Sequence, residues 1–87
     1  MKRVASVQDI LRRWDPIGIR PGEFGPADEY DDYAPHIVSM VARGCTRAAL
    51  CDHLGKLRTR TIGVEADPWH DATIAGAILE TLARAEA

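Results

Sequence analysis

The most regular stretch of the chain is residues 67–84, which read DPWHDATIAGAILETLAR. Asp67 followed by Pro68 is typical of a helix start, because aspartate accepts hydrogen bonds from free N–H groups and proline at the first position needs no N–H. Apolar residues then recur at helical spacing on one stripe, namely Ile74, Ala75, Ile78, Leu79 and Leu82. The pattern predicts a helix from Pro68 to about Arg84 with one buried face.

Trp69 lies off this apolar stripe, roughly 150° around the helix at 100° per residue. It shares its face with small residues, namely Ala72, Thr73, Gly76 and Ala83. Small residues let a second element approach closely, so we predict that Trp69 covers a second side of the core. An exposed anchor for a partner is the alternative interpretation.

Two helices are expected before the middle of the chain. The first covers residues 7–14, where Val7, Ile10, Leu11 and Trp14 follow the helical period, and Pro16 ends it. The second is capped by Asp31 or Asp32 and ends at Gly44. Its apolar side consists of Tyr33, Ile37, Met40 and Val41.

A third helix is expected after Thr46, which is a good N-cap residue. It carries Leu50, Cys51, Leu54 and Leu57, and we predict a break at Gly55 and a weak continuation toward Thr61. Gly63 ends the segment. With the helix of residues 68–84, this makes an all-α fold, a compact bundle of about four short helices in a single domain spanning residues 1–87.

A long loop rich in proline and glycine separates the first two helices, from Asp15 to about Asp31. Loops of this length in small domains either serve a function or wrap the core. We predict wrapping, with Ile17, Ile19 and Phe24 as the apolar contacts.

Charge and composition exclude several classes of protein. The formal net charge of −2 on 87 residues is too small for a general nucleic-acid binder. The charges are separated along the chain, however, since residues 21–40 carry only acids and residues 41–60 are mostly basic. No stretch is long and apolar enough to span a membrane, and we expect a cytoplasmic protein.

No pattern predicts a catalytic site, a cofactor or a metal. Cys45 and Cys51 are too far apart along a helix to pair and are expected as reduced thiols. His36, His53 and His70 lack the spacing of zinc ligands, and no glycine-rich phosphate loop is present. We therefore expect a protein that is not an enzyme.

The most distinctive local composition is Asp28-Glu29-Tyr30-Asp31-Asp32-Tyr33. Carboxylates steer a basic partner and tyrosines provide rigid contact area, so these six residues are the predicted partner-binding site. The competing interpretation is a solvated acidic turn with both tyrosines partly in the core. A second candidate function is a nucleic-acid-associated accessory or regulatory subunit that binds through the basic stretch from Arg43 to Arg60, although its basic residues have no aromatic residues between them.

The segments Trp14-Asp15-Pro16-Ile17-Gly18 and Asp28-Glu29-Tyr30 also carry a resemblance. The chain resembles a family of small, uncharacterised bacterial helical proteins, in which W-D-P-x-G follows the first helix and a D-E-Y acidic segment comes next. This resemblance implies a helical architecture and a bacterial origin, and it implies no reaction. In length, helical content and acidic tyrosine segment, the chain is also similar to immunity proteins that neutralise bacterial nuclease toxins. The acidic segment and the likeness to immunity proteins lead us to expect a basic protein as the partner.

Overall fold

The computed structural model describes residues 2–20, 22–26 and 28–86. Within these ranges the chain forms four α-helices, two shorter helical turns and no strand. In chain order the elements are α1 (Lys2–Trp14), η1 (Asp31–Tyr33), α2 (Ala34–Ala42), α3 (Arg47–Lys56), η2 (Leu57–Ile62) and α4 (Pro68–Glu86). The predicted all-α bundle, with a long loop after its first helix, is confirmed.

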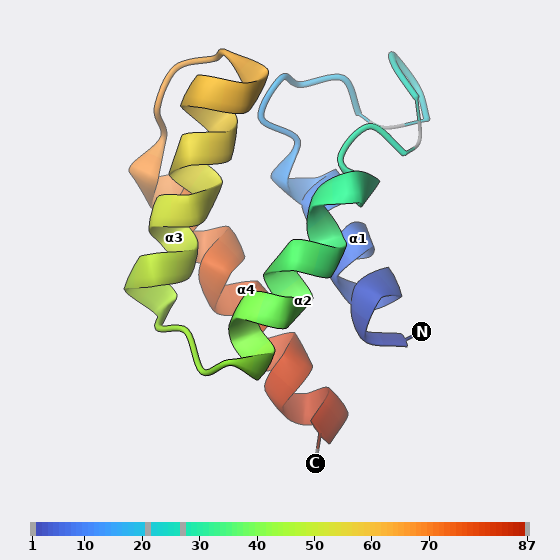
Figure 1. The fold of residues 1–87 in the computed structure, drawn as a ribbon. Coiled ribbons are helices and arrows are strands. Elements are labelled where there is room, and N and C mark those ends of the chain that lie inside the picture. The colour runs from blue at the N-terminus through green and yellow to red at the C-terminus, as the bar shows by residue number, and fades with distance from the viewer. Residues whose placement is uncertain (1, 21, 27, 87) are drawn as a thin grey trace.

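The last helix, α4, is central to the packing. It contacts both α1 and α3, and α1 also contacts α2; Figure 1 shows α4 passing behind α2 and α3. The predicted stripe faces the core, since Ile74, Ala75, Ile78 and Leu82 are buried and Leu79 packs partly against them. Asp67 Oδ1 accepts a hydrogen bond from the His70 N–H at 3.2 Å, so the predicted N-cap is confirmed.

The first helix begins earlier than predicted, at Lys2 instead of Val7. The residues before Val7 contain no helix breaker, and lysine, arginine and alanine are good helix formers, so the helix gains a turn. Its predicted apolar face is buried, consisting of Val7, Ile10, Leu11 and Trp14.

The start of the second helix differs from the prediction. Residues Asp31–Tyr33 form a 3-10 turn, and Tyr33 is the N-cap residue of α2, with no side-chain hydrogen bond at the cap. The predicted cap by Asp31 or Asp32 is therefore wrong, because both aspartates lie inside the turn that precedes the helix. Pro35 lies in the first turn of α2, where its missing N–H costs nothing.

The third helix runs through Gly55 without a break, which contradicts the prediction. Packing of α3 against α4 supplies more stability than one glycine removes. The chain then continues into the π-helical turn η2. Just after this turn, the N–H groups of Gly63 and Val64 both donate to Arg58 O at 3.0 Å. The predicted cap by Thr46 is confirmed, since its Oγ1 accepts from the Ala49 N–H at 3.0 Å.

The long loop wraps the core with only one of its three predicted residues. Ile19 packs against the core, whereas Ile17 is 37% exposed and Phe24 is 72% exposed. Phe24 instead lies under the Arg20 guanidinium, 5.8 Å from the ring centroid. Wrapping by Ile17 and Phe24 is therefore wrong.

Trp69 is 86% exposed, so it does not cover a second side of the core as predicted. An arginine occupies that side of α4. The Arg47 guanidinium donates to Ala72 O at 3.0 Å and 3.2 Å and lies about 3.1 Å from where a Cβ on Gly76 would stand. The small residues of this face make room for Arg47, and Trp69 is left in solvent.

Candidate functional site

The structure separates the six predicted partner-binding residues into an exposed and an inward-facing set. Asp28, Glu29 and Asp32 are exposed and form what we call the acidic ridge. Asp31 and Tyr33 are half-buried. Tyr30 is 1% exposed, so its predicted role as a contact for a partner is wrong.

Tyr30 fastens the segment to the core. Its ring meets the Trp14 ring edge-on, with 5.7 Å between centroids, and its hydroxyl donates to Asp15 Oδ1 at 2.7 Å. Burial, together with this hydrogen bond to a carboxylate, raises the pKa of Tyr30 well above its usual value. Tyr30 therefore stays protonated and keeps its bond to Asp15.

Asp15 organises the loop between Trp14 and Tyr30. It adopts a left-handed backbone conformation with φ of 41°, which aspartate tolerates better than most residues. Its carboxylate also accepts the N–H groups of Ile19 at 3.0 Å and Arg20 at 2.9 Å. Partial burial acts to raise the pKa of Asp15, but these hydrogen bonds and the one from Tyr30 bring it below 3.8.

A salt bridge holds the other end of the segment. Asp31 Oδ2 lies 3.0 Å from Arg12 Nη2 of α1, and the Gln8 side chain reaches Asp31 O at 3.5 Å. The acidic ridge is therefore presented by a turn that is tied down on both sides. Rigid presentation lowers the entropy lost when a partner binds.

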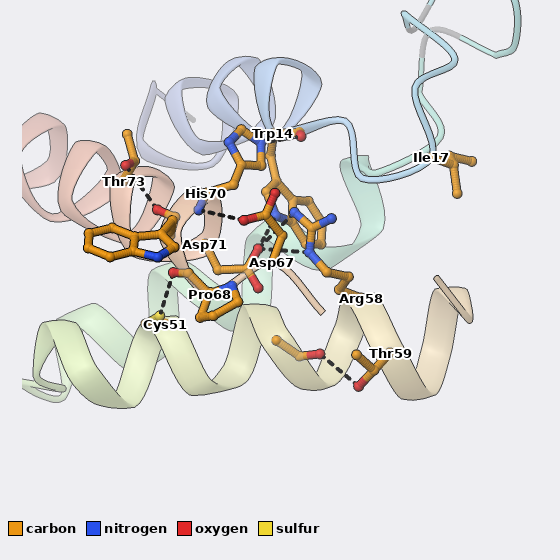
Figure 2. Close-up of polar contacts among 12 residues, drawn as sticks. Trp14, Ile17, Cys51, Arg58, Thr59, Asp67, Pro68, His70, Asp71 and Thr73 are labelled. Atoms are coloured by element: carbon orange, nitrogen blue, oxygen red, sulfur yellow. Dashed lines mark hydrogen bonds and ion pairs between the residues drawn. The ribbon is translucent and has the colours of Figure 1, made fainter. Parts of the chain in front are cut away.

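A buried polar network joins the end of α1 to the start of α4 (Figure 2). Asp71 Oδ1 accepts the Trp14 indole N–H at 2.8 Å and two N–H groups of Arg58, at 3.0 Å and 2.9 Å. The Arg58 guanidinium also lies over the Trp14 ring, and His70 Nε2 lies 2.6 Å from Trp14 O. No local sequence pattern predicts this network, because its residues lie far apart along the chain.

The basic stretch from Arg43 to Arg60 has one of its five cations in the core. Arg58 is buried with Asp71, and Arg47 is bonded to the backbone of α4. Lys56 pairs with an aspartate one turn earlier in α3, and Arg43 bonds to a serine one turn earlier in α2. Arg58 cannot reach a phosphate group from its buried position.

Two of the three histidines meet between α2 and α3. The rings of His36 and His53 are 5.0 Å apart, and burial, together with the neighbouring charges of His36 and Lys56, lowers the pKa of His53. Both cysteines are free thiols, partly buried. Across residues 2–20, 22–26 and 28–86, no three His, Cys, Asp or Glu side chains gather as metal ligands, and no helix is long and apolar enough to cross a membrane.

Comparisons with known proteins give no further guide to the site. No family model, no curated protein and no solved structure matches this chain.

Proposed function

We propose that this chain is a non-catalytic protein-binding module of the cytoplasm whose acidic ridge covers a basic surface on a partner protein. More narrowly, we propose an inhibitor of the immunity type, which neutralises a basic toxin by covering its working surface. The observation that carries the proposal is the fixed display of Asp28, Glu29 and Asp32 on a turn whose Tyr30 is buried.

Physical reasons connect this display with binding. Three exposed carboxylates in five residues attract a basic partner over a distance and raise the association rate. Since Tyr30 is bonded to Asp15 and Asp31 is paired with Arg12, little ordering is left to occur on binding. The nucleic-acid alternative loses two of its cations, because Arg58 is buried with Asp71 and Lys56 is paired with Asp52.

The proposal is tested by co-purification from the source organism with three tagged forms of the protein. The first is the wild type and the second carries Asp28→Lys, Glu29→Lys and Asp32→Lys. The third is a control with the same change in net charge, Asp9→Lys, Glu65→Lys and Glu80→Lys, at exposed acids outside the ridge. Mass spectrometry quantifies the proteins recovered with each form.

We expect one basic protein to be recovered with the wild type and the control and to be lost from the ridge variant. With that partner purified, the association rate of the wild type should fall steeply as salt is added, and that of the ridge variant should change less. The proposal would be overturned if the basic protein were lost equally from the ridge and control variants, or if the wild type recovered nucleic acid alone.

A further inference from the structure

A groove opens between α3, η2 and the start of α4, on a different part of the surface from the acidic ridge. Its volume is about 540 Å³, in the range of small-ligand sites. Its lining includes small side chains, one thiol and one buried carboxylate, namely Ala48, Cys51, Gly55, Ala66, Pro68 and Asp71.

The floor of the groove has an acceptor without a donor. Asp71 is 1% exposed, and its three hydrogen bonds all end on Oδ1. Oδ2 instead faces Gly55 of α3 and receives no hydrogen bond from any residue that the structure describes. Oδ2 is not among the fully buried oxygens without a partner, so it is open to the groove and can accept a hydrogen bond from a donor that enters there.

Gly55 keeps this oxygen open. It lies inside α3 without the positive φ that would require glycine, and a Cβ there would meet only Asp71 Oδ2, at 3.7 Å. Neither a turn nor crowding therefore requires glycine, although glycine disfavours a helix interior. An alanine would fit, and its methyl group would stand between the groove and Oδ2.

The charges around the groove are balanced, so the acceptor itself selects the donor. Three carboxylates line the groove, Asp52, Asp67 and Asp71, and three cations balance them, namely Lys56 and Arg60 in the lining and the buried Arg58 beside Asp71. Lys56 Nζ is held 3.1 Å from Asp52 by a side chain that is 56% exposed, so it does not fill the centre. Arg58 compensates the charge of Asp71 through Oδ1, which leaves Oδ2 as the acceptor facing the groove.

We propose that this groove is a binding site for a primary alkylammonium group. The ammonium N–H groups donate to Asp71 Oδ2, and the methylene stem lies against Ala48, Gly55 and Ala66. A charged donor forms a stronger hydrogen bond to a carboxylate than a neutral one does. Such a group is carried by small amines and by the lysine side chain of a protein. The site is independent of the acidic ridge.

The test is a titration of the isotope-labelled protein with n-butylammonium chloride, followed by ¹⁵N-¹H NMR. The Trp14 indole N–H is the reporter, because it donates to the other oxygen of the Asp71 carboxylate. Tetramethylammonium chloride supplies the charge without an N–H donor, and n-butanol supplies the stem without the charge. Gly55→Ala is the matched variant, and it should fold with a higher melting temperature.

We expect a saturable shift of the Trp14 indole resonance with n-butylammonium alone, and loss of that shift in Gly55→Ala. No saturable shift in the wild type, an equal shift with n-butanol or tetramethylammonium, or an unchanged shift in Gly55→Ala would each overturn the site. A parallel titration with Nα-acetyl-lysine methylamide distinguishes the two sources of the alkylammonium group, a small amine and the lysine side chain of a protein. Tighter binding than n-butylammonium assigns the site to a lysine of a protein, and weaker binding assigns it to a small amine.

Discussion

The Trp14 indole donates a 2.8 Å hydrogen bond to Asp71 Oδ1, across 57 positions of the chain. The bond joins the last residue of α1 to the first turns of α4, and both side chains are buried. The Trp14 ring also contacts Tyr30, which in turn is bonded to Asp15. The W-D-P-x-G and D-E-Y segments thus meet at one junction that holds the fold together.

Loss of the charge of Asp71 should destabilise the protein strongly. Asp71→Asn leaves Arg58 as a buried cation without its counter-ion, and the expected loss in the free energy of unfolding is about 3 to 5 kcal/mol. Urea denaturation followed by circular dichroism measures it. Asp52→Asn, which breaks the exposed pair with Lys56, is the control and should cost less than about 1 kcal/mol. Similar losses in the two variants would contradict a structural role for the buried pair.

The hydroxyl of Tyr30 should stabilise the loop through Asp15. Tyr30→Phe removes the hydrogen bond to a carboxylate, and the expected cost is about 1.5 to 3 kcal/mol at neutral pH. Because that bond lowers the pKa of Asp15 in the folded state, the stabilisation is complete above the unfolded pKa near 3.8 and is lost as the pH falls through the folded value.

Carbon-detected NMR titration of the Asp15 carboxyl group checks the same bond directly. Its pKa should rise in Tyr30→Phe and stay low in Tyr33→Phe, a matched change at the half-buried tyrosine of the same segment. An Asp15 pKa that is equal in the wild type and Tyr30→Phe would show that the backbone N–H groups alone lower it.

His53 should make the protein less stable in mild acid. Burial, His36 and Lys56 lower its folded pKa, while Asp52 acts in the opposite direction. The unfolded chain therefore takes up a proton near pH 6.5 before the folded chain does, so stability is complete above that pH and declines as the pH falls toward the folded pKa.

Urea denaturation of the wild type and His53→Gln at several pH values isolates this contribution. The difference in the free energy of unfolding between the two should change between about pH 7.5 and about pH 5.5, with the wild type losing more stability. A constant difference over that interval would rule out His53 as its source.

The two tryptophans should differ sharply in their effect on stability. Trp69→Ala should change the free energy of unfolding by less than about 0.5 kcal/mol, because the side chain is 86% exposed. Trp14→Ala should cost about 3 to 5 kcal/mol, since it opens a cavity in the core. Acrylamide quenching offers a second readout, as the fluorescence remaining in Trp69→Ala should resist quenching while the protein is folded.

Short-range patterns in the sequence predicted the helices, most of their boundaries and the side that each turns to the core. The caps at Thr46 and Asp67 and the buried stripe of α4 depend on residues within a turn or two, so short-range patterns are sufficient to find them. The residues of the acidic ridge could also be found from the local amino-acid composition. Its display could not, because that depends on Tyr30 reaching Asp15 and Trp14.

Packing between helices sets which of the aromatic and charged residues are available to a partner. Tyr30 went inward, as the competing interpretation of the acidic segment has it, because it packs against Trp14. Trp69 went outward, against expectation, because Arg47 occupies the face beside it. The burial of Arg58 and the opening above Asp71 Oδ2 likewise arise where η2, α3 and α4 meet. Such contacts join residues that are distant along the chain, and hydrophobic periodicity carries no information about them.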